Sequence, residues 1–158
     1  MNRFRVTCLF LTIFCVGVLD IVLAEEIRGS GQGVYVQQSI DTFNLPHGGI
    51  AQRTTSSGFI LADDPNNPLH RTNQNCSGTG IASSDGQNYS GSGYCDMIDA
   101  SGSVAWIWYR GNETGGTWGF IDGSGRFDGV TGGGTYNIVL GWEDGKQINN
   151  WEGTYEID

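Results

Sequence analysis

Aromatic residues in the second half of the chain carry the clearest chemical signal in the sequence. Trp106 and Trp108 alternate in the run VAWIWYR, so in a β-strand their side chains point to the same face. Indole rings gathered on one face stack on flat apolar molecules or on sugar-like rings. The sequence therefore predicts a ligand-binding wall, for which the candidate residues are Trp106, Trp108, Trp118, Tyr136 and Trp142.

Reactive groups of other kinds are few. The two histidines, His47 and His70, have no companion at metal-ligand spacing, so we predict neither a metal site nor a cofactor. Acidic residues at 63–64 and 96–99 offer oxygen ligands but do not follow a calcium-loop spacing. The sequence has no phosphate-binding loop, nucleophile elbow or paired-carboxylate motif, and we assign no catalytic residue.

The charge of the chain limits its partners. Eight basic and 17 acidic residues give a formal net charge of −9 at pH 7. A field of this sign repels phosphate backbones and anionic membrane surfaces. Nucleic acid is therefore excluded as an expected partner, while the same charge keeps a free protein soluble.

The first 24 residues have the pattern of a secretory signal peptide. A short basic segment at 1–5 precedes an apolar run at 6–19, and small residues close the segment at Ala24. A transmembrane anchor is the competing interpretation, but Asp20 interrupts the run before the roughly 20 apolar residues that span a bilayer. We predict cleavage after Ala24 and one mature domain, 25–158, secreted or periplasmic and without a stable membrane anchor.

Two cysteines remain in the predicted mature chain. Cys76 and Cys95 lie on segments that we interpret as neighbouring strands, and an even number of cysteines in an oxidising compartment favours a disulfide. Closing a loop of this size would stabilise the fold by about 3 kcal/mol in the chain-entropy model. A catalytic thiol is disfavoured because neither cysteine has a histidine near it in sequence.

The apolar pattern predicts an all-β chain. Short runs rich in β-branched and aromatic residues recur between turn-forming clusters, and no segment keeps a helical repeat. A closed antiparallel barrel fits, because closure removes the sheet edges that promote aggregation; an open sandwich is the alternative. The predicted strands are Gly33–Gln38, Arg53–Leu61, Ser77–Ala82, Ser90–Ile98, Ser103–Tyr109, Thr117–Ile121, Gly133–Trp142 and Asn150–Ile157.

Two connections stand out between these strands. The glycine-dense segment 115–136, GGTWGFIDGSGRFDGVTGGGTY, has the pattern of a β-hairpin whose glycines curve the sheet and turn the chain. The segment 62–75 contains Pro65 and Pro68 and is the longest irregular connection. Such a loop is either an ordinary surface turn or a functional loop at the barrel mouth.

The glycine hairpin resembles the strand-turn-strand of allene oxide cyclase and dirigent-like barrels. The match is closest to secreted bacterial proteins with an allene oxide cyclase barrel-like domain of calycin type, which also pair CSGTG with GSGYC, as at 76–80 and 91–95. With Asp99 and Gly102 the resemblance covers about residues 55–142. The matching hairpin residues are Gly123, Gly125, Phe127, Gly129, Val130, Thr131, Gly132 and Gly134.

This resemblance implies an eight-stranded antiparallel up-and-down barrel that holds a small hydrophobic molecule. It also implies that a homo-oligomer can form through the outer faces, with no residue that fixes a number. The catalytic residues of the plant cyclases have no matching position here. We therefore expect a non-enzymatic binding or interaction module, because family likeness alone does not establish activity.

Two alternatives remain open at this stage. One is an isomerase or cyclase that folds a hydrophobic substrate inside the barrel, with Glu113 or Tyr136 as acid or base. The other is a barrel whose tryptophans fill the interior, since eight strands enclose a lumen only just wide enough for side chains or one small ligand. The two alternatives and the binding module differ in whether the lumen is open and whether a titratable group points into it.

Overall fold

A computed structural model describes residues 25–85 and 88–157. The predicted signal peptide, 1–24, lies outside the described residues. All eight predicted strands are present, and each is longer than predicted. They are β1 (Glu25–Asn44), β2 (Ile50–Ala62), β3 (Asn73–Ala82), β4 (Tyr89–Ile98), β5 (Val104–Asn112), β6 (Gly115–Ser124), β7 (Thr131–Glu143) and β8 (Lys146–Ile157), with a short 3-10 helix, η1 (Gly125–Phe127), between β6 and β7.

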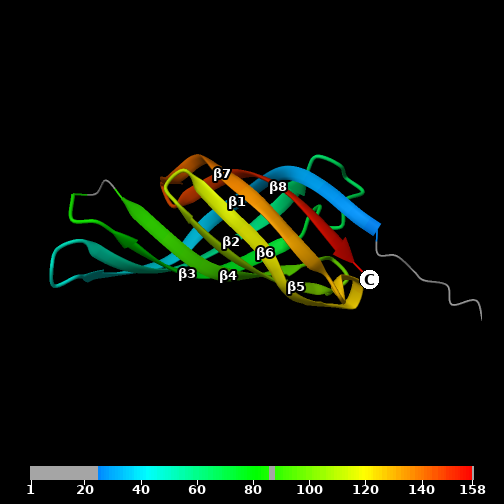
Figure 1. Ribbon diagram of the computed structural model, residues 1–158, viewed down its shortest axis with the longest axis horizontal. Helices are drawn as coiled ribbons and strands as arrows, with labels where there is room; N and C mark the ends of the chain where they lie inside the picture. Colours follow the sequence, from blue (N-terminus) through cyan, green and yellow to red (C-terminus); the bar gives the residue numbers. More distant parts are fainter. Residues whose placement is uncertain (1–24, 86–87, 158) are drawn as a thin grey trace, which may run out of the picture.

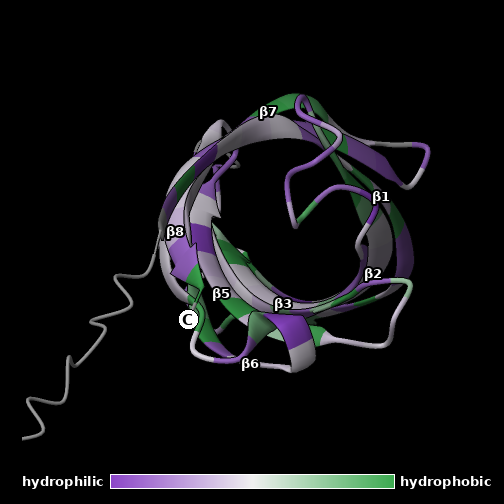
Figure 2. Cartoon of the chain, turned by 90° about the vertical axis from the view of Figure 1, so that its right-hand side faces the viewer, coloured by the Kyte–Doolittle hydropathy of each residue, from purple (hydrophilic) through white to green (hydrophobic). Residues whose placement is uncertain are grey.

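The strands form one closed barrel rather than an open sandwich. Each strand pairs antiparallel with its neighbour in sequence, and β1 pairs with β8 to close the sheet (Figure 1). Seen end-on, the strands make a continuous ring (Figure 2). The prediction of an eight-stranded up-and-down barrel is confirmed. Within the described part of the chain, no helix has the length and apolar character needed to cross a membrane.

Strand β1 begins well before the predicted start at Gly33. The sequence GSGQG at 29–33 gives no strand signal, because glycine has a low strand propensity. In the structure the segment pairs along its length with β8. A Cβ atom on Gly29 would lie 3.0 Å from the Trp151 ring, so this glycine makes room for an indole of the adjacent strand.

The inner wall of the barrel pairs aromatic rings with glycines of the neighbouring strands. Tyr109 on β5 is in register with Gly93 on β4, and Gly93 is in register with Gly78 on β3. The Tyr109 hydroxyl extends over both glycines, since a Cβ atom on Gly93 would lie 2.5 Å from it. The phenol ring therefore lies along the wall across two strands, in space that a side chain would otherwise fill.

The same arrangement recurs around the barrel. Trp118 on β6 is in register with Gly134 on β7, which is in register with Gly153 on β8. A Cβ atom on Gly153 would lie 2.5 Å from Trp118 Cζ2. Other examples are Tyr136 with Gly116 and Gly111, Tyr89 with Gly80, and Tyr35 with Gly58.

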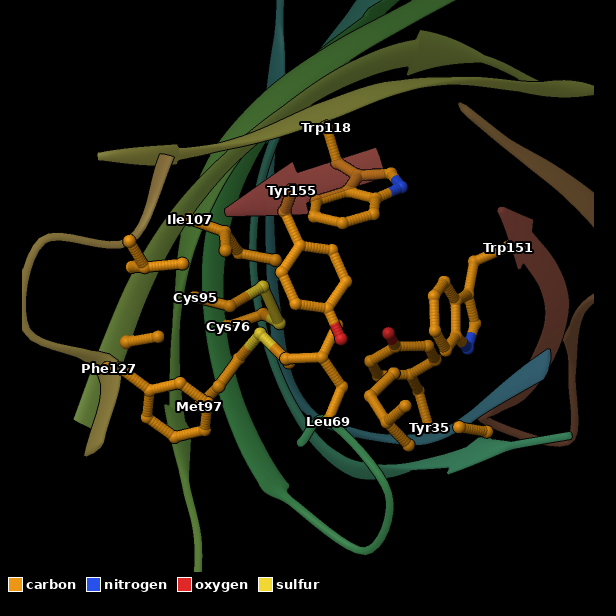
Figure 3. Close-up of a cluster of buried hydrophobic side chains, with 14 residues drawn as sticks. Tyr35, Leu69, Cys76, Cys95, Met97, Ile107, Trp118, Phe127, Trp151 and Tyr155 are labelled. Carbon is orange, nitrogen blue, oxygen red and sulfur yellow. A yellow bond between two sulfur atoms is a disulfide. The ribbon is translucent and has the colours of Figure 1, made fainter. Parts of the chain in front are cut away.

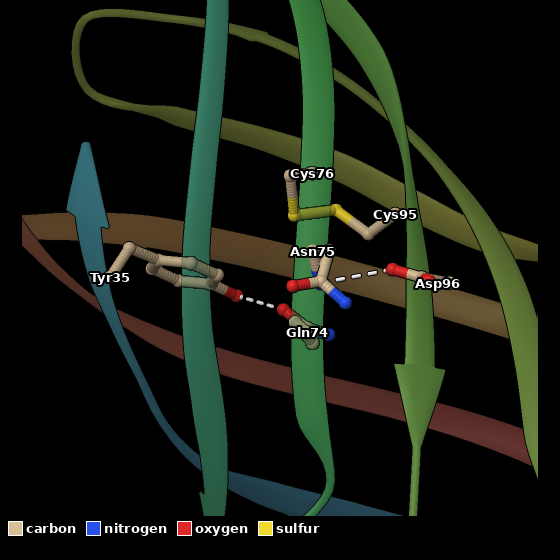
Figure 4. The surroundings of a disulfide bond; sticks show 6 residues. All are labelled: Tyr35, Gln74, Asn75, Cys76, Cys95 and Asp96. Atoms are coloured by element: carbon tan, nitrogen blue, oxygen red, sulfur yellow. Dashed lines mark hydrogen bonds between the residues drawn. A yellow bond between two sulfur atoms is a disulfide. The ribbon is translucent and has the colours of Figure 1, made fainter. Parts of the chain in front are cut away.

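The predicted disulfide is confirmed. Cys76 on β3 and Cys95 on β4 are register partners and are joined by the bond (Figure 4). Both are buried, so the bridge forms part of the inner wall. Next to the disulfide, side chains of β3 alternate between the two faces of the sheet. Gln74 faces inward, and its Oε1 accepts a hydrogen bond from the Tyr35 hydroxyl with 2.6 Å between the oxygens. Asn75 is exposed, and its backbone N–H donates to the Asp96 carboxylate.

The pairing of rings with glycines predicts the effect of adding one methyl group. A Cβ atom on Gly80 would lie 2.5 Å from Tyr89 Cζ. We expect Gly80→Ala to lower the free energy of unfolding by about 1–3 kcal/mol, because the ring must move. In a Tyr89→Ala background the same change is expected to be neutral or slightly stabilising.

Urea unfolding of the four proteins in this double-mutant cycle measures the effect. Gly141→Ala is the control, because a Cβ atom there meets nothing within 4 Å. An equal cost of Gly80→Ala in both backgrounds would contradict the arrangement.

Candidate ligand-binding site in the barrel lumen

The barrel encloses a cavity of about 410 Å³. Its mouth lies at the end formed by the β1–β2, β5–β6 and β7–β8 turns, where Ile40, Glu113 and Trp142 line it. At the opposite end, its walls are Leu69 and Met97. A cavity of this size is within the range of small-molecule sites, about 300–1,000 Å³. The lumen is thus a cup rather than a filled core.

The floor of the cup is the loop between β2 and β3. This loop, 63–72, bends into the ring of strands at the end of the barrel that faces the viewer in Figure 2. Leu69 is 2% exposed and joins the buried cluster of Figure 3, and the Tyr155 hydroxyl donates to Asn67 Oδ1 at 2.7 Å. The proline-containing loop is therefore a plug that closes one end of the barrel, not a loop at its mouth.

The Arg126 side chain connects this plug to the neighbouring loops. Arg126 Nε lies 2.5 Å from Asp99 Oδ2, and the Arg126 guanidinium also donates to the Pro68 carbonyl of the plug. The Asp99 side chain is only 7% exposed. Burial alone would raise the pKa of Asp99, but hydrogen bonds from Ser101 and Ser103 and the charge of Arg126 outweigh it and lower that pKa.

Four tyrosines supply the polar groups of the aromatic wall. Burial raises the pKa of Tyr109 to about 12, with a smaller contribution from the neighbouring Tyr89 and Tyr136. Burial likewise raises the pKa of Tyr35, Tyr89 and Tyr136 above the ordinary value. All four phenols are therefore neutral near pH 7 and offer hydrogen bonds without charge.

Three of the five predicted ligand-binding residues line the cavity. Trp118, Tyr136 and Trp142 are in its wall, Trp118 and Tyr136 within the barrel and Trp142 at the mouth. Trp118 packs edge-on against Trp151 at a ring distance of 6.1 Å, and its indole N–H donates to the Thr135 carbonyl. The three predicted residues come from two neighbouring strands, β6 and β7, and Trp151 comes from β8, so the barrel brings them around one space.

Trp106 and Trp108 lie elsewhere, and the expectation that they face the lumen is corrected. On β5 the inward residues are Ala105 and Ile107, which are buried, while Trp106 is 41% exposed. Trp108 packs on the outer face under the Arg110 guanidinium, 5.4 Å from its ring centre. The wall predicted from this strand is formed instead by Ile107 and Tyr109.

Several residues that line the cavity were not predicted from the sequence. Trp151 and Asn149 on β8 are 6% and 9% exposed and line the cavity, as does Gln74 on β3. The signal for β8 was available: in NNWEGTYEI, Asn149, Trp151, Gly153 and Tyr155 alternate with polar residues. No such signal marks Tyr35, because apolar and polar residues occur at both the odd and the even positions of its strand.

Charged and metal-binding groups are scarce at the site. Glu113 is the sole charged residue among the described lining residues, and its side chain is exposed at the mouth. No group of three or more potential metal-ligating side chains occurs in residues 25–85 and 88–157. The chemistry of the lumen is therefore that of neutral hydrogen-bonding groups on an aromatic wall.

Comparison with known proteins finds similarity at the level of structure. No protein-family model and no curated protein sequence matches the chain. The solved structure of the pterocarpan synthase dirigent protein GePTS1 matches with a TM-score of 0.54 and 12% identity, over 95% of this chain and 99% of that chain. This chain has a dirigent-like barrel fold.

A second solved structure gives the same result. The pterocarpan synthase dirigent protein PsPTS1 matches with a TM-score of 0.54 and 12% identity, over 84% of this chain and 96% of that chain. At this identity the dirigent-like likeness establishes the fold alone. It confirms the barrel implied by the glycine hairpin and the cysteine motifs.

The ion pair at the floor predicts a pH-dependent stability. A lowered carboxyl pKa stabilises the fold above the ordinary value of 3.8, and this contribution is lost as the pH falls through the folded-state pKa. We expect Asp99→Asn to lower the free energy of unfolding at pH 7 by about 1–3 kcal/mol. The difference from the wild type should shrink between pH 5 and about pH 2, because both proteins are then uncharged at this position.

Guanidinium unfolding at several pH values measures this difference. Asp128→Asn is the matched control, because that carboxylate is exposed and follows the same short helix. A difference between Asp99→Asn and the wild type that stays constant with pH would refute the role of the ion pair.

Proposed function

We propose that this protein is a non-enzymatic binding module that holds a small, uncharged, largely apolar molecule inside the barrel. The observation that carries the proposal is the cavity of about 410 Å³, open at one end and walled by aromatic rings. Rings that lie along the wall leave the barrel axis free for a guest. Binding sites of this kind combine apolar surface with a few placed polar groups.

The charge distribution supports an uncharged guest. Transferring an ion from water into an apolar lumen is costly unless an opposite charge receives it. The lining phenols remain neutral because burial raises their pKa. The exposed Glu113 at the mouth would repel anions that approach the entrance.

Catalysis by an acid or base is less well supported. An isomerase or cyclase needs a group that exchanges a proton near neutral pH. Tyr136 lines the lumen, but its raised pKa favours the protonated phenol and makes it a poor base. Glu113 lines the mouth, away from the enclosed part of the cavity. The dirigent-like fold is compatible with a guiding role that needs no catalytic side chain.

Secretion remains part of the proposal. A disulfide persists in oxidising compartments such as the periplasm or the extracellular space. Together with the signal-like segment 1–24, this favours a protein that meets its guest outside the cytoplasm.

Filling the lumen tests the proposed function. Ser56 on β2 lines the cavity, and its neighbour Ser57 does not. We expect Ser56→Trp to weaken binding of naphthalene and 2-naphthol by about tenfold or more, because the added indole occupies the guest's space. Ser57→Trp, which adds the same ring to the outer face, should bind as the wild type does.

Isothermal titration calorimetry with the two aromatic probes gives the affinities, and thermal unfolding shows that both variants are folded. Absence of binding by the wild type at the solubility limit of both probes would overturn the proposed function. Equal binding by Ser56→Trp and the wild type would overturn it as well, because the probes would then bind outside the lumen.

A further inference from the structure

Two buried polar atoms in the lumen wall have no hydrogen-bond partner. They are Asn149 Oδ1, an acceptor, and Trp151 Nε1, a donor. Both residues line the cavity, and their side chains are more than nine-tenths buried. Buried polar groups are nearly always hydrogen-bonded in native proteins, so an unpartnered pair in a ligand cavity points to a bound group.

The Asn149 side chain has a hydrogen bond with Tyr35, but the surrounding residues leave its Oδ1 atom without a partner. The Asn149 amide and the Tyr35 hydroxyl both lie over Gly33, where a Cβ atom would be 2.6 Å from Asn149 Oδ1. The Tyr35 hydroxyl has a single hydrogen, which it donates in a hydrogen bond to Gln74 Oε1, with 2.6 Å between the two oxygens. Asn149 Oδ1 therefore receives no proton from its neighbour.

The Trp151 donor is left free in a similar way. Trp151 lies between Gly31 on β1 and Tyr136 on β7 in the sheet register, and its ring meets the edge of Trp118. Trp118 Nε1, by contrast, is bonded to the Thr135 carbonyl. Of the two inner indoles, one is satisfied by the backbone and the other is not.

Asn149 and Trp151 are two residues apart on β8, so their side chains face the same side of the sheet. Their Cα atoms are roughly 7 Å apart along the strand. We propose that they bind a neutral hydroxyl-bearing ring compound, whose hydroxyl or comparable neutral groups donate to Asn149 Oδ1 and accept from Trp151 Nε1. This inference rests on the proposed function, because it names the guest of the same cavity.

Ions fit this pair poorly. A carboxylate accepts from Trp151 but has no proton for Asn149, and its lone pairs would face the amide oxygen. An ammonium group donates to Asn149 but cannot accept from Trp151. A pure hydrocarbon leaves both atoms unpaired, and sites that hydrogen-bond a hydroxyl discriminate strongly against the analogue that lacks it.

Three probes of nearly equal shape test the inference: 2-naphthol, naphthalene and 2-naphthoate. We expect the wild type to bind 2-naphthol at least about tenfold more tightly than either of the others at pH 7. In Asn149→Leu the advantage of 2-naphthol over naphthalene should fall to about threefold or less, while naphthalene still binds. Trp151→Phe, which keeps a ring but loses the N–H, should reduce the same ratio.

Asn150→Leu is the matched control. Asn150 is the next residue of β8, exposed on the outer face, where it accepts a hydrogen bond from Gln32. This variant should keep the wild-type preference. Thermal unfolding of Asn149→Leu and Asn150→Leu checks that both variants fold.

The outcomes separate this inference from the function on which it rests. Binding of the probes without a preference for 2-naphthol, or a preference for 2-naphthoate, overturns the inference and leaves lumenal binding intact. A preference that persists in Asn149→Leu also overturns it, because the hydroxyl would then not depend on the Asn149 amide. Failure of all three probes to bind the wild type overturns the proposed function itself.

Discussion

The interaction on which this barrel depends is the packing of inward aromatic rings over inward glycines. An eight-stranded barrel has an interior barely wide enough for its own side chains. Here rings such as Tyr109 extend sideways over the glycines of the next two strands instead of pointing to the axis. The wall is therefore thick with aromatic surface while the centre stays open, and a cavity of about 410 Å³ results.

The two ends of the barrel have different roles because different contacts form there. At the floor, the 63–72 plug is held by the Leu69 side chain and the Tyr155–Asn67 hydrogen bond. Arg126, which is paired with Asp99, also donates a hydrogen bond to the plug. At the mouth, short turns leave the entrance open beside Trp142 and Glu113. A cup closed on one side admits a guest by one route and buries it against the neutral groups of β8.

Much of the fold could be predicted from the sequence. Alternating patterns and turn residues locate all eight strands, and Cys76 and Cys95 pair as their spacing between neighbouring strands suggests. The role of the glycines was not predictable in the same way. Whether Gly78 lies beneath Tyr109 depends on the register between three strands, which no local pattern specifies.

The candidate site was predicted in part for a related reason. In VAWIWYR the odd and the even positions both carry apolar or aromatic residues. Alternation therefore does not show whether Trp106 and Trp108 or Ile107 and Tyr109 face inward. Trp106 and Trp108 lie outside because they are in register with Asp96 and the exposed Tyr94 of β4. The inward positions of β4 at 93 and 95 are in register with 109 and 107 instead. In β8 the polar residues at 150, 152, 154 and 156 mark the outer face clearly, and the same reasoning would have identified Trp151.

The central claim is that a neutral guest binds inside the lumen against β8. The most direct measurement is the ¹H–¹⁵N NMR spectrum of the five tryptophan indoles during titration with 2-naphthol. The account predicts that the Trp151 indole signal shifts as a hydrogen bond forms, while the signals of the outward Trp106 and Trp108 stay in place. Shifts confined to Trp106 and Trp108 would contradict it, because they would place the guest on the outer face of the barrel.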